Sequence, residues 1–299
     1  MKRCFVGLLL CLGVFSAIPL SQASVLRPGQ SFGVQDQVNL GMFSDPRFYA
    51  LHPTSVRLNI NWNQALSNSS LRSFTDQWYA LAVANHLQPL IVFGALYEKA
   101  PSTEMYRKAV KAAIARWPQA AFQAWNEANH SSQPTYHKPQ LAADYAKILD
   151  KACSHKCLDV PLTVVLYQDA VTGRWVKAFL KAYGRAPKIW AIHTYGDANR
   201  YTNIQLKWFM RTFHPKDVWV TETGAWYYFT KEKAFKKPSL ARQKKAALYV
   251  LDPARLYREV KRIYYFEWQA STKAIWDSAL LGVSGQARPA YNVLLQELN

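Results

Sequence analysis

Two glutamates stand at comparable places in the chain, each directly after a short apolar segment. Glu127 lies in Ala-Trp-Asn-Glu-Ala-Asn, and Glu222 lies in Trp-Val-Thr-Glu-Thr-Gly. Two carboxyl groups that face each other across a cleft can cleave a glycosidic bond, because one protonates the leaving oxygen while the other attacks the anomeric carbon or activates water. Either glutamate alone could instead cap a helix or pair with one of the many Lys and Arg side chains. As a pair, Glu127 and Glu222 predict a site for cleavage of a glycosidic bond.

The elements that must position these glutamates alternate between strand-like and helix-like segments. Short apolar, β-rich segments recur at 32–34, 55–60, 89–93, 122–125, 162–166, 189–193, 218–221 and 263–268. Between them lie segments with helical periodicity, for example 70–86, 103–117, 138–153, 174–183, 204–213 and 241–250. Strands that are apolar throughout are typical of a parallel sheet covered by helices on both faces.

This alternation predicts an α/β protein with a (β/α)8 TIM barrel, formed as a single domain by residues 24–299. A doubly wound open sheet is the alternative, but no glycine-rich phosphate-binding turn follows the first strand. In a closed barrel, side chains at the carboxyl ends of the strands converge on one cleft. The fourth and seventh predicted strands end at Glu127 and Glu222, on opposite sides of a narrow mouth. A short separation of that kind favours a retaining mechanism.

The N-terminus and the cysteines indicate export. Residues 1–23 have the basic start, apolar run and small residues of a cleaved signal peptide, and the run is shorter than the roughly 20 residues that a membrane-spanning helix needs. Cys153 and Cys157 predict a local disulfide; the alternative, a metal site with His155, lacks a fourth ligand nearby. We expect a secreted or periplasmic monomer with no membrane span after cleavage, and with no metal or other cofactor.

The chain is strongly basic, with 37 Lys and Arg against 19 Asp and Glu and a formal net charge of +18. Such a charge favours anionic partners, or it only keeps an exported protein soluble. Nucleic acid is not expected as a partner, because the basic residues are spread over several helices and no phosphate-binding loop is recognisable.

The segment after Glu222 combines aromatic and basic residues. Trp226 stands in Ala-Trp-Tyr-Tyr-Phe, and the segment continues with Lys231, Lys233, Lys236 and Lys237. We expect Trp226 to bind substrate by stacking on a sugar ring and the lysines to attract an anionic polysaccharide. The alternative is that the aromatic side chains pack under the loop and the lysines form a solvated face.

Taken in order along the chain, these motifs resemble clan A of the glycoside hydrolases, most closely families 5 and 39. The matching residues are Asn126 with Glu127, Glu222 in Val-Thr-Glu-Thr-Gly, His193 and Tyr195 in Ile-His-Thr-Tyr-Gly, and Trp268 in Phe-Glu-Trp-Gln. The order and strand positions agree over nearly the whole chain after residue 23. The resemblance implies a barrel enzyme with Glu127 as general acid/base at the end of strand four and Glu222 as nucleophile at the end of strand seven.

The resemblance also implies a task for each matching residue. Asn126 would hydrogen-bond the sugar 2-hydroxyl, and Trp268 would offer an aromatic ring to the sugar. His193 and Tyr195 would hold the nucleophile ionised and correctly aimed, although His193 could also be a core histidine. Arg57, in Ser-Val-Arg-Leu-Asn, would lower the pKa of the nucleophile, with a surface ion pair as the alternative.

One part of the sequence departs from the family pattern. Family 5 members usually carry a histidine near the end of strand three, where this chain has Val-Phe-Gly-Ala-Leu-Tyr at 92–97. Without long insertions to wall off the mouth, we expect an open groove and endo action on a polysaccharide or oligosaccharide. The alternatives are a non-catalytic carbohydrate-binding barrel and a transglycosylase that uses the same residues.

Overall fold

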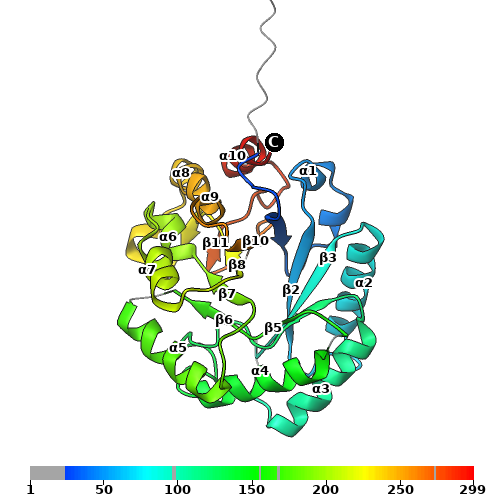
Figure 1. Cartoon of the computed structure of the whole chain (residues 1–299). Coiled ribbons are helices and arrows are strands. Elements are labelled where there is room, and N and C mark those ends of the chain that lie inside the picture. Colours follow the sequence, from blue (N-terminus) through cyan, green and yellow to red (C-terminus); the bar gives the residue numbers. More distant parts are fainter. Residues whose placement is uncertain (1–23, 96–98, 155, 167–168, 273) are drawn as a thin grey trace, which may run out of the picture.

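A single parallel sheet forms the centre of the molecule, with helices around it (Figure 1). The computed structural model describes residues 24–95, 99–154, 156–166, 169–272 and 274–299, so the predicted signal peptide and His155 lie outside the described residues. The strand order is β5-β4-β3-β2-β1-β10-β8-β7-β6. The strands are β1 (Ser31–Gln35), β2 (Ser55–Asn61), β3 (Gln88–Gly94), β4 (Ala121–Gln123), β5 (Asp159–Val160), β6 (Thr163–Val165), β7 (Trp190–His193), β8 (Val218–Thr223) and β10 (Val260–Phe266).

The two ends of this sheet, β5 and β6, are halves of one interrupted strand. β5 pairs with β4, and β6 pairs with β7. The interruption contains Pro161, which has no backbone N–H to donate to a neighbouring strand. Beyond it, the Thr163 N–H donates to the Trp125 carbonyl at 3.0 Å, so the contact with the β4 side continues. The sheet therefore closes into a barrel of eight strand positions, which confirms the predicted fold.

The helices pack outside the strands. Three of them begin with a serine whose side-chain oxygen accepts a hydrogen bond from the helix backbone, at Ser69, Ser102 and Ser239. The longer helices are α2 (Ser70–Ala84), α3 (Thr103–Arg116), α4 (Pro139–Cys153), α5 (Asp169–Tyr183), α7 (Ile204–Phe213), α8 (Leu240–Val250) and α10 (Pro289–Leu298). The short ones are η1 (Leu40–Ser44), α1 (Pro46–Tyr49), α6 (Tyr195–Arg200), η2 (Lys233–Phe235) and α9 (Asp252–Leu256).

Side chains along each strand alternate between the helices and the barrel interior. In β2, Val56 and Leu58 join the large outer core, whereas Arg57 and Asn59 do not. A separate apolar cluster fills the interior, made by Leu90, Val92, Ala121, Val160, Ile189, Ala191, Trp219 and Tyr264. Arg57 and Asn59 follow on the carboxyl-terminal side of the buried Ser55 in β2, so strand alternation brings both side chains into the barrel toward its carboxyl-terminal end.

Two features lie outside the barrel strands. β9 (Tyr228–Phe229) and β11 (Trp276–Asp277) form a small antiparallel pair. Cys153, at the end of α4, is bonded to Cys157 just before β5, which confirms the predicted disulfide. Within the described part of the chain, no helix is both long and apolar enough to cross a membrane.

Candidate active site

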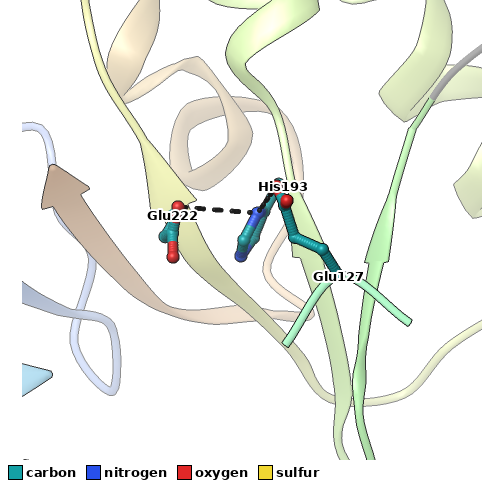
Figure 2. Close-up of side chains that lie close together, drawn as sticks. All are labelled: Glu127, His193 and Glu222. Carbon is teal, nitrogen blue, oxygen red and sulfur yellow. Dashed lines mark hydrogen bonds and ion pairs between the residues drawn. The ribbon is translucent and has the colours of Figure 1, made fainter. Parts of the chain in front are cut away.

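Glu127 and Glu222 lie on opposite sides of His193, and an interaction joins each of them to its ring, as Figure 2 shows. The Nδ1 atom of His193 lies 3.0 Å from Glu127 Oε1 and 3.7 Å from Glu222 Oε2. The nearest ligating atoms of the three side chains all lie within 4.8 Å of one another. The structure therefore brings the two predicted carboxyl groups together at the carboxyl ends of their strands.

The turn after β4 sets the direction of Glu127. Its φ of +46° lies in the left-handed region, which is uncommon for a residue with a β-carbon. Hydrogen bonds fix the backbone on both sides: Asn126 N–H donates to the Phe93 carbonyl at 2.9 Å, and Ala128 N–H donates to the Thr163 carbonyl at 3.0 Å. The Glu127 side chain remains 20% exposed, against 6% for Glu222. Glu127 is thus the carboxyl group that is open to a reacting molecule from solvent.

Glu222 accepts hydrogen bonds on both of its oxygens. The buried Arg57 guanidinium pairs with Oε1, to which Asn59 Nδ2 also donates at 3.3 Å. The Tyr195 hydroxyl donates to Oε2 at 3.1 Å. Arg57 and Asn59 belong to β2 and Tyr195 follows β7, so donors from two strands hold both oxygens and leave the carboxylate little freedom to rotate.

The surroundings of Glu222 favour its ionised form. Burial alone raises the pKa of this carboxyl, but the electrostatic attraction of His193 and Arg57, with hydrogen bonds from Arg57 and Asn59, outweighs burial and lowers the pKa to about 2. Burial and the charges of Glu222 and Glu127 raise the pKa of Tyr195 well above its ordinary value, so its hydroxyl stays protonated and remains a donor. At neutral pH, Glu222 is an anion held by neutral and cationic donors.

Arg57 connects this carboxylate to the other side of the mouth. Its Nη1 atom also donates to the Gln35 side chain, and its Nη2 atom donates to Asn126 Oδ1 at 2.8 Å. Because the Asn126 oxygen is already engaged, its amide N–H groups are what it can offer to a substrate. The predicted residues Arg57, Asn126, His193 and Tyr195 therefore form one network around the two glutamates.

Glu127, His193 and Glu222 also have the side-chain types of a metal site. However, both Glu222 oxygens are occupied by donors, and the adjacent Arg57 already supplies a positive charge. A second cation beside Arg57 would be repelled. The arrangement is better suited to acid–base and nucleophilic chemistry than to metal binding.

Trp268 does not reach this cleft, which corrects its prediction as a sugar-binding ring. The side chain is 1% exposed and belongs to the outer core. Its ring packs edge-on against Phe48 at 5.7 Å and Tyr291 at 6.2 Å, between the barrel and the outer helices. The physical reason is that β10 ends at Phe266, so the chain has already left the barrel when it reaches Trp268.

Trp226 also differs from its prediction as a stacking platform. It is 4% exposed and packs against Tyr195 and Phe235, with ring centroids 6.1 and 5.0 Å away. The four lysines that follow it are exposed. The alternative of aromatic side chains packed under the loop therefore applies to Trp226, whose ring stacks on that of Tyr195.

Sequence reasoning missed three residues at this site. Asn59 follows Arg57 by two positions, so strand alternation could have placed both in the barrel interior. Phe266 has the same relation to the interior residue Tyr264, and it is half-buried. Trp276 comes from β11, outside the barrel strands, and no sequence pattern indicates that its ring lies 4.7 Å from that of Tyr195. Phe266 and Trp276 lie 5.6 Å apart and form the partly open aromatic surface near Glu222.

One family model and several solved structures are similar to this chain. The family model described as "Glycosyl hydrolase catalytic core" matches residues 92–293, which include both glutamates. No curated protein sequence matches the chain.

Several solved glycoside hydrolases share the fold at low sequence identity. A family 5 subfamily 18 protein from Bifidobacterium longum, in complex with Manβ1-4GlcNAc, has a TM-score of 0.65 and 12% identity over 90% of this chain and 78% of its own. A family 128 endo-β-1,3-glucanase from Amycolatopsis mediterranei, in complex with laminaritriose, has a TM-score of 0.60 and 14% identity over 90% of this chain and 99% of its own. A family 39 β-xylosidase from Caulobacter crescentus has a TM-score of 0.58 and 16% identity over 91% of this chain and 72% of its own.

Proposed function

The chain belongs to the glycosyl hydrolase catalytic core family and is a glycoside hydrolase, and from this premise we propose that it cleaves β-linked polysaccharides with retention of configuration. The observation that carries the proposal is the approach of Glu127 and Glu222 oxygens to within 4.8 Å. Retaining enzymes hold their carboxyl groups about 5–5.5 Å apart, whereas inverting enzymes leave about 6.5–9.5 Å for a water molecule.

In the first half of the reaction, Glu127 donates its proton to the glycosidic oxygen as the leaving sugar departs. Glu222, held as an anion by Arg57, Asn59 and Tyr195, attacks the anomeric carbon and forms a covalent glycosyl ester. Asn126 donates from its amide to the sugar 2-hydroxyl, a contact that strengthens as positive charge develops on the ring.

In the second half, Glu127 takes a proton from an incoming water, whose oxygen attacks the same carbon and releases Glu222. His193 reaches both carboxyl groups through Nδ1 and holds Glu127 in place while its charge changes. The cycle requires only residues of this chain and water.

The substrate class and the location rest on further observations. The three solved relatives have β-linked sugars or β-glycosidase activity in their descriptions, which supports a β-linked substrate here. The proposed endo action follows from the predicted open groove. The Cys153–Cys157 disulfide is typical of an oxidising compartment and supports secretion.

The test is turnover of a panel of polysaccharides by residues 24–299, with the anomeric configuration of the first product followed by NMR. The panel contains β-1,3-glucan, β-mannan, xylan and uronate-containing polymers. A product of retained configuration, lost in Glu222→Gln, is the expected result. Inversion would contradict the proposed double displacement, and binding without turnover would favour a non-catalytic carbohydrate-binding barrel.

A further inference from the structure

A concave surface lies on the catalytic face, beside the segment that carries Glu127. It has a volume of about 280 Å³, near the lower end of the roughly 300–1,000 Å³ usual for ligand pockets. Its walls come from the loop between β4 and α4 and from the start of α5. The lining residues are Asn129, Tyr136, His137, Pro139, Val171, Arg174 and Trp175.

Hydrogen bonds fix the walls of this pocket. Asn129 donates from Nδ2 to the Val165 carbonyl at 2.9 Å and accepts from the Val165 N–H at 2.8 Å, which ties the Glu127 loop to β6. The Trp175 indole N–H donates to the Tyr136 carbonyl at 2.8 Å, which ties the same loop to α5. These bonds join the loop that carries Glu127 to β6 and α5, and they hold the walls of the pocket together.

The lining is basic and contains no carboxylate. Arg174 and His137 are both exposed, and neither forms an ion pair within the described ranges. Arg174 can bind a carboxylate or sulfate with two parallel hydrogen bonds, because the guanidinium presents its donors as a planar fork. Its charge in this pocket is not matched by any acidic residue of the described lining.

The remaining walls suit a sugar ring. Tyr136 is half-buried and Trp175 is 8% exposed, so both present part of an apolar ring to the pocket. Aromatic rings pack against the C–H faces of sugars, while the basic groups reach a charged substituent. A pyranose that carries an acidic group could contact the aromatic rings with its C–H face and the basic side chains with its charged substituent.

We propose that this pocket binds an acidic sugar residue of the substrate, on the side of the leaving group. The placement rests on the proposed function, because Glu127 protonates the leaving oxygen and Asn129 follows it by two residues in the same loop. The polysaccharide would then carry carboxylate or sulfate groups beyond the cleaved bond. The net charge of +18 favours the approach of such a polymer.

The first experiment measures binding without turnover. In residues 24–299 carrying Glu222→Gln, ligand-observed NMR compares D-glucuronate, D-glucose 6-sulfate and D-glucose at constant ionic strength. The acidic sugars are expected to bind more tightly than glucose. Arg174→Gln should lower the affinity for the acidic sugars by on the order of tenfold and leave the affinity for glucose unchanged. Lys177→Gln removes an exposed charge one turn further along α5, outside the pocket, and should change nothing.

The outcomes separate the pocket from the proposed function. Preference for glucuronate alone or for the sulfate alone supports the pocket and identifies the acidic group. Equal binding of all three sugars, or equal losses in Arg174→Gln and Lys177→Gln, overturns the pocket. Retaining turnover of neutral polymers with no preference for acidic ones would leave the proposed function standing and overturn this inference. Selective binding of acidic sugars without turnover of any polymer would support the pocket and contradict the proposed function.

Discussion

Arg57 and Glu222 form an ion pair inside the barrel mouth, in which the arginine side chain is fully buried and the glutamate side chain is 6% exposed. A pair of this kind differs from a surface ion pair, because removing one member leaves an uncompensated charge out of contact with water. Arg57 also reaches Gln35 and Asn126, so one guanidinium organises three strand ends. The site and the stability of the fold are therefore linked at this residue.

Replacing Arg57 should destabilise the whole protein. For Arg57→Met we expect the free energy of unfolding to fall by about 3–5 kcal/mol, because Glu222 keeps its charge but loses its partner. Urea denaturation measures the change. The matched control is Arg107→Met, whose pair with Glu104 is exposed and should contribute less than about 1 kcal/mol. Equal losses of unfolding free energy in the two variants would show that the buried pair stabilises the fold no more than the exposed pair does.

Removing His193 should shift the pH dependence of activity. His193 is one of the groups that lower the pKa of Glu222, so His193→Asn should raise that pKa. The acidic limb of the kcat/KM profile, which reports ionisation in the free enzyme, then moves to higher pH. His214→Asn, at an exposed histidine outside the site, is the control. An acidic limb that stays in place in His193→Asn would contradict the role of His193 in keeping Glu222 ionised.

Glu267 should make stability fall as pH rises. Burial, followed by the nearby charges of Asp36 and Asp277 and opposed by Arg288, raises its pKa from 4.5 to about 8. Between those values the unfolded chain releases a proton that the folded protein retains, so the free energy of unfolding decreases with pH. Glu267→Gln, which has no ionisable group at this position, should remove this decrease in the free energy of unfolding.

The measurement for Glu267 is urea denaturation of both proteins at pH 4 and pH 9. Relative to the wild type, Glu267→Gln should be more stable at pH 9 than at pH 4. Glu104→Gln, at an exposed position, should show no such difference between the two pH values. The same relative stability of Glu267→Gln at both pH values would count against the raised pKa.

The loss of rate on replacing Glu127 should be larger for a leaving group that must be protonated than for one that departs as an anion. Glu127→Gln should reduce turnover of a polysaccharide by about 100- to 10,000-fold, which is the usual contribution of general acid–base catalysis. With a dinitrophenyl glycoside the first step needs no proton, so the loss in that step should be much smaller. Pre-steady-state release of dinitrophenol measures it. Glu232→Gln, at the Glu232–Arg200 ion pair away from Glu127, is the control. An equal loss on both substrates would mean that Glu127 is not the acid.

The alternation of strands and helices was sufficient to predict the barrel and the pair of glutamates. Strand alternation also explains why Arg57 enters the interior, since Val56 and Leu58 face the helices. The two-residue strand β5 was not predicted, because so short a segment carries no periodicity.

The aromatic residues could not be placed in the same way. Trp226 and Trp268 stand near motifs that end strands, yet the paths of the following loops bury both. Trp276 approaches Tyr195 only because β11 pairs with β9 beside the barrel. Loop paths depend on tertiary packing, which the local sequence does not contain.

The interrupted strand β5–β6 implies that the rim of the barrel is unevenly rigid. Glu222 belongs to a six-residue strand that is paired on both sides, and its amides should exchange with deuterium only when the protein unfolds as a whole. Glu127 follows a three-residue strand next to the interruption at Pro161, where few hydrogen bonds must break for a local opening. The proposed nucleophile, Glu222, therefore lies on the more rigid side of the barrel, and the proposed proton donor, Glu127, lies on the side that opens more easily.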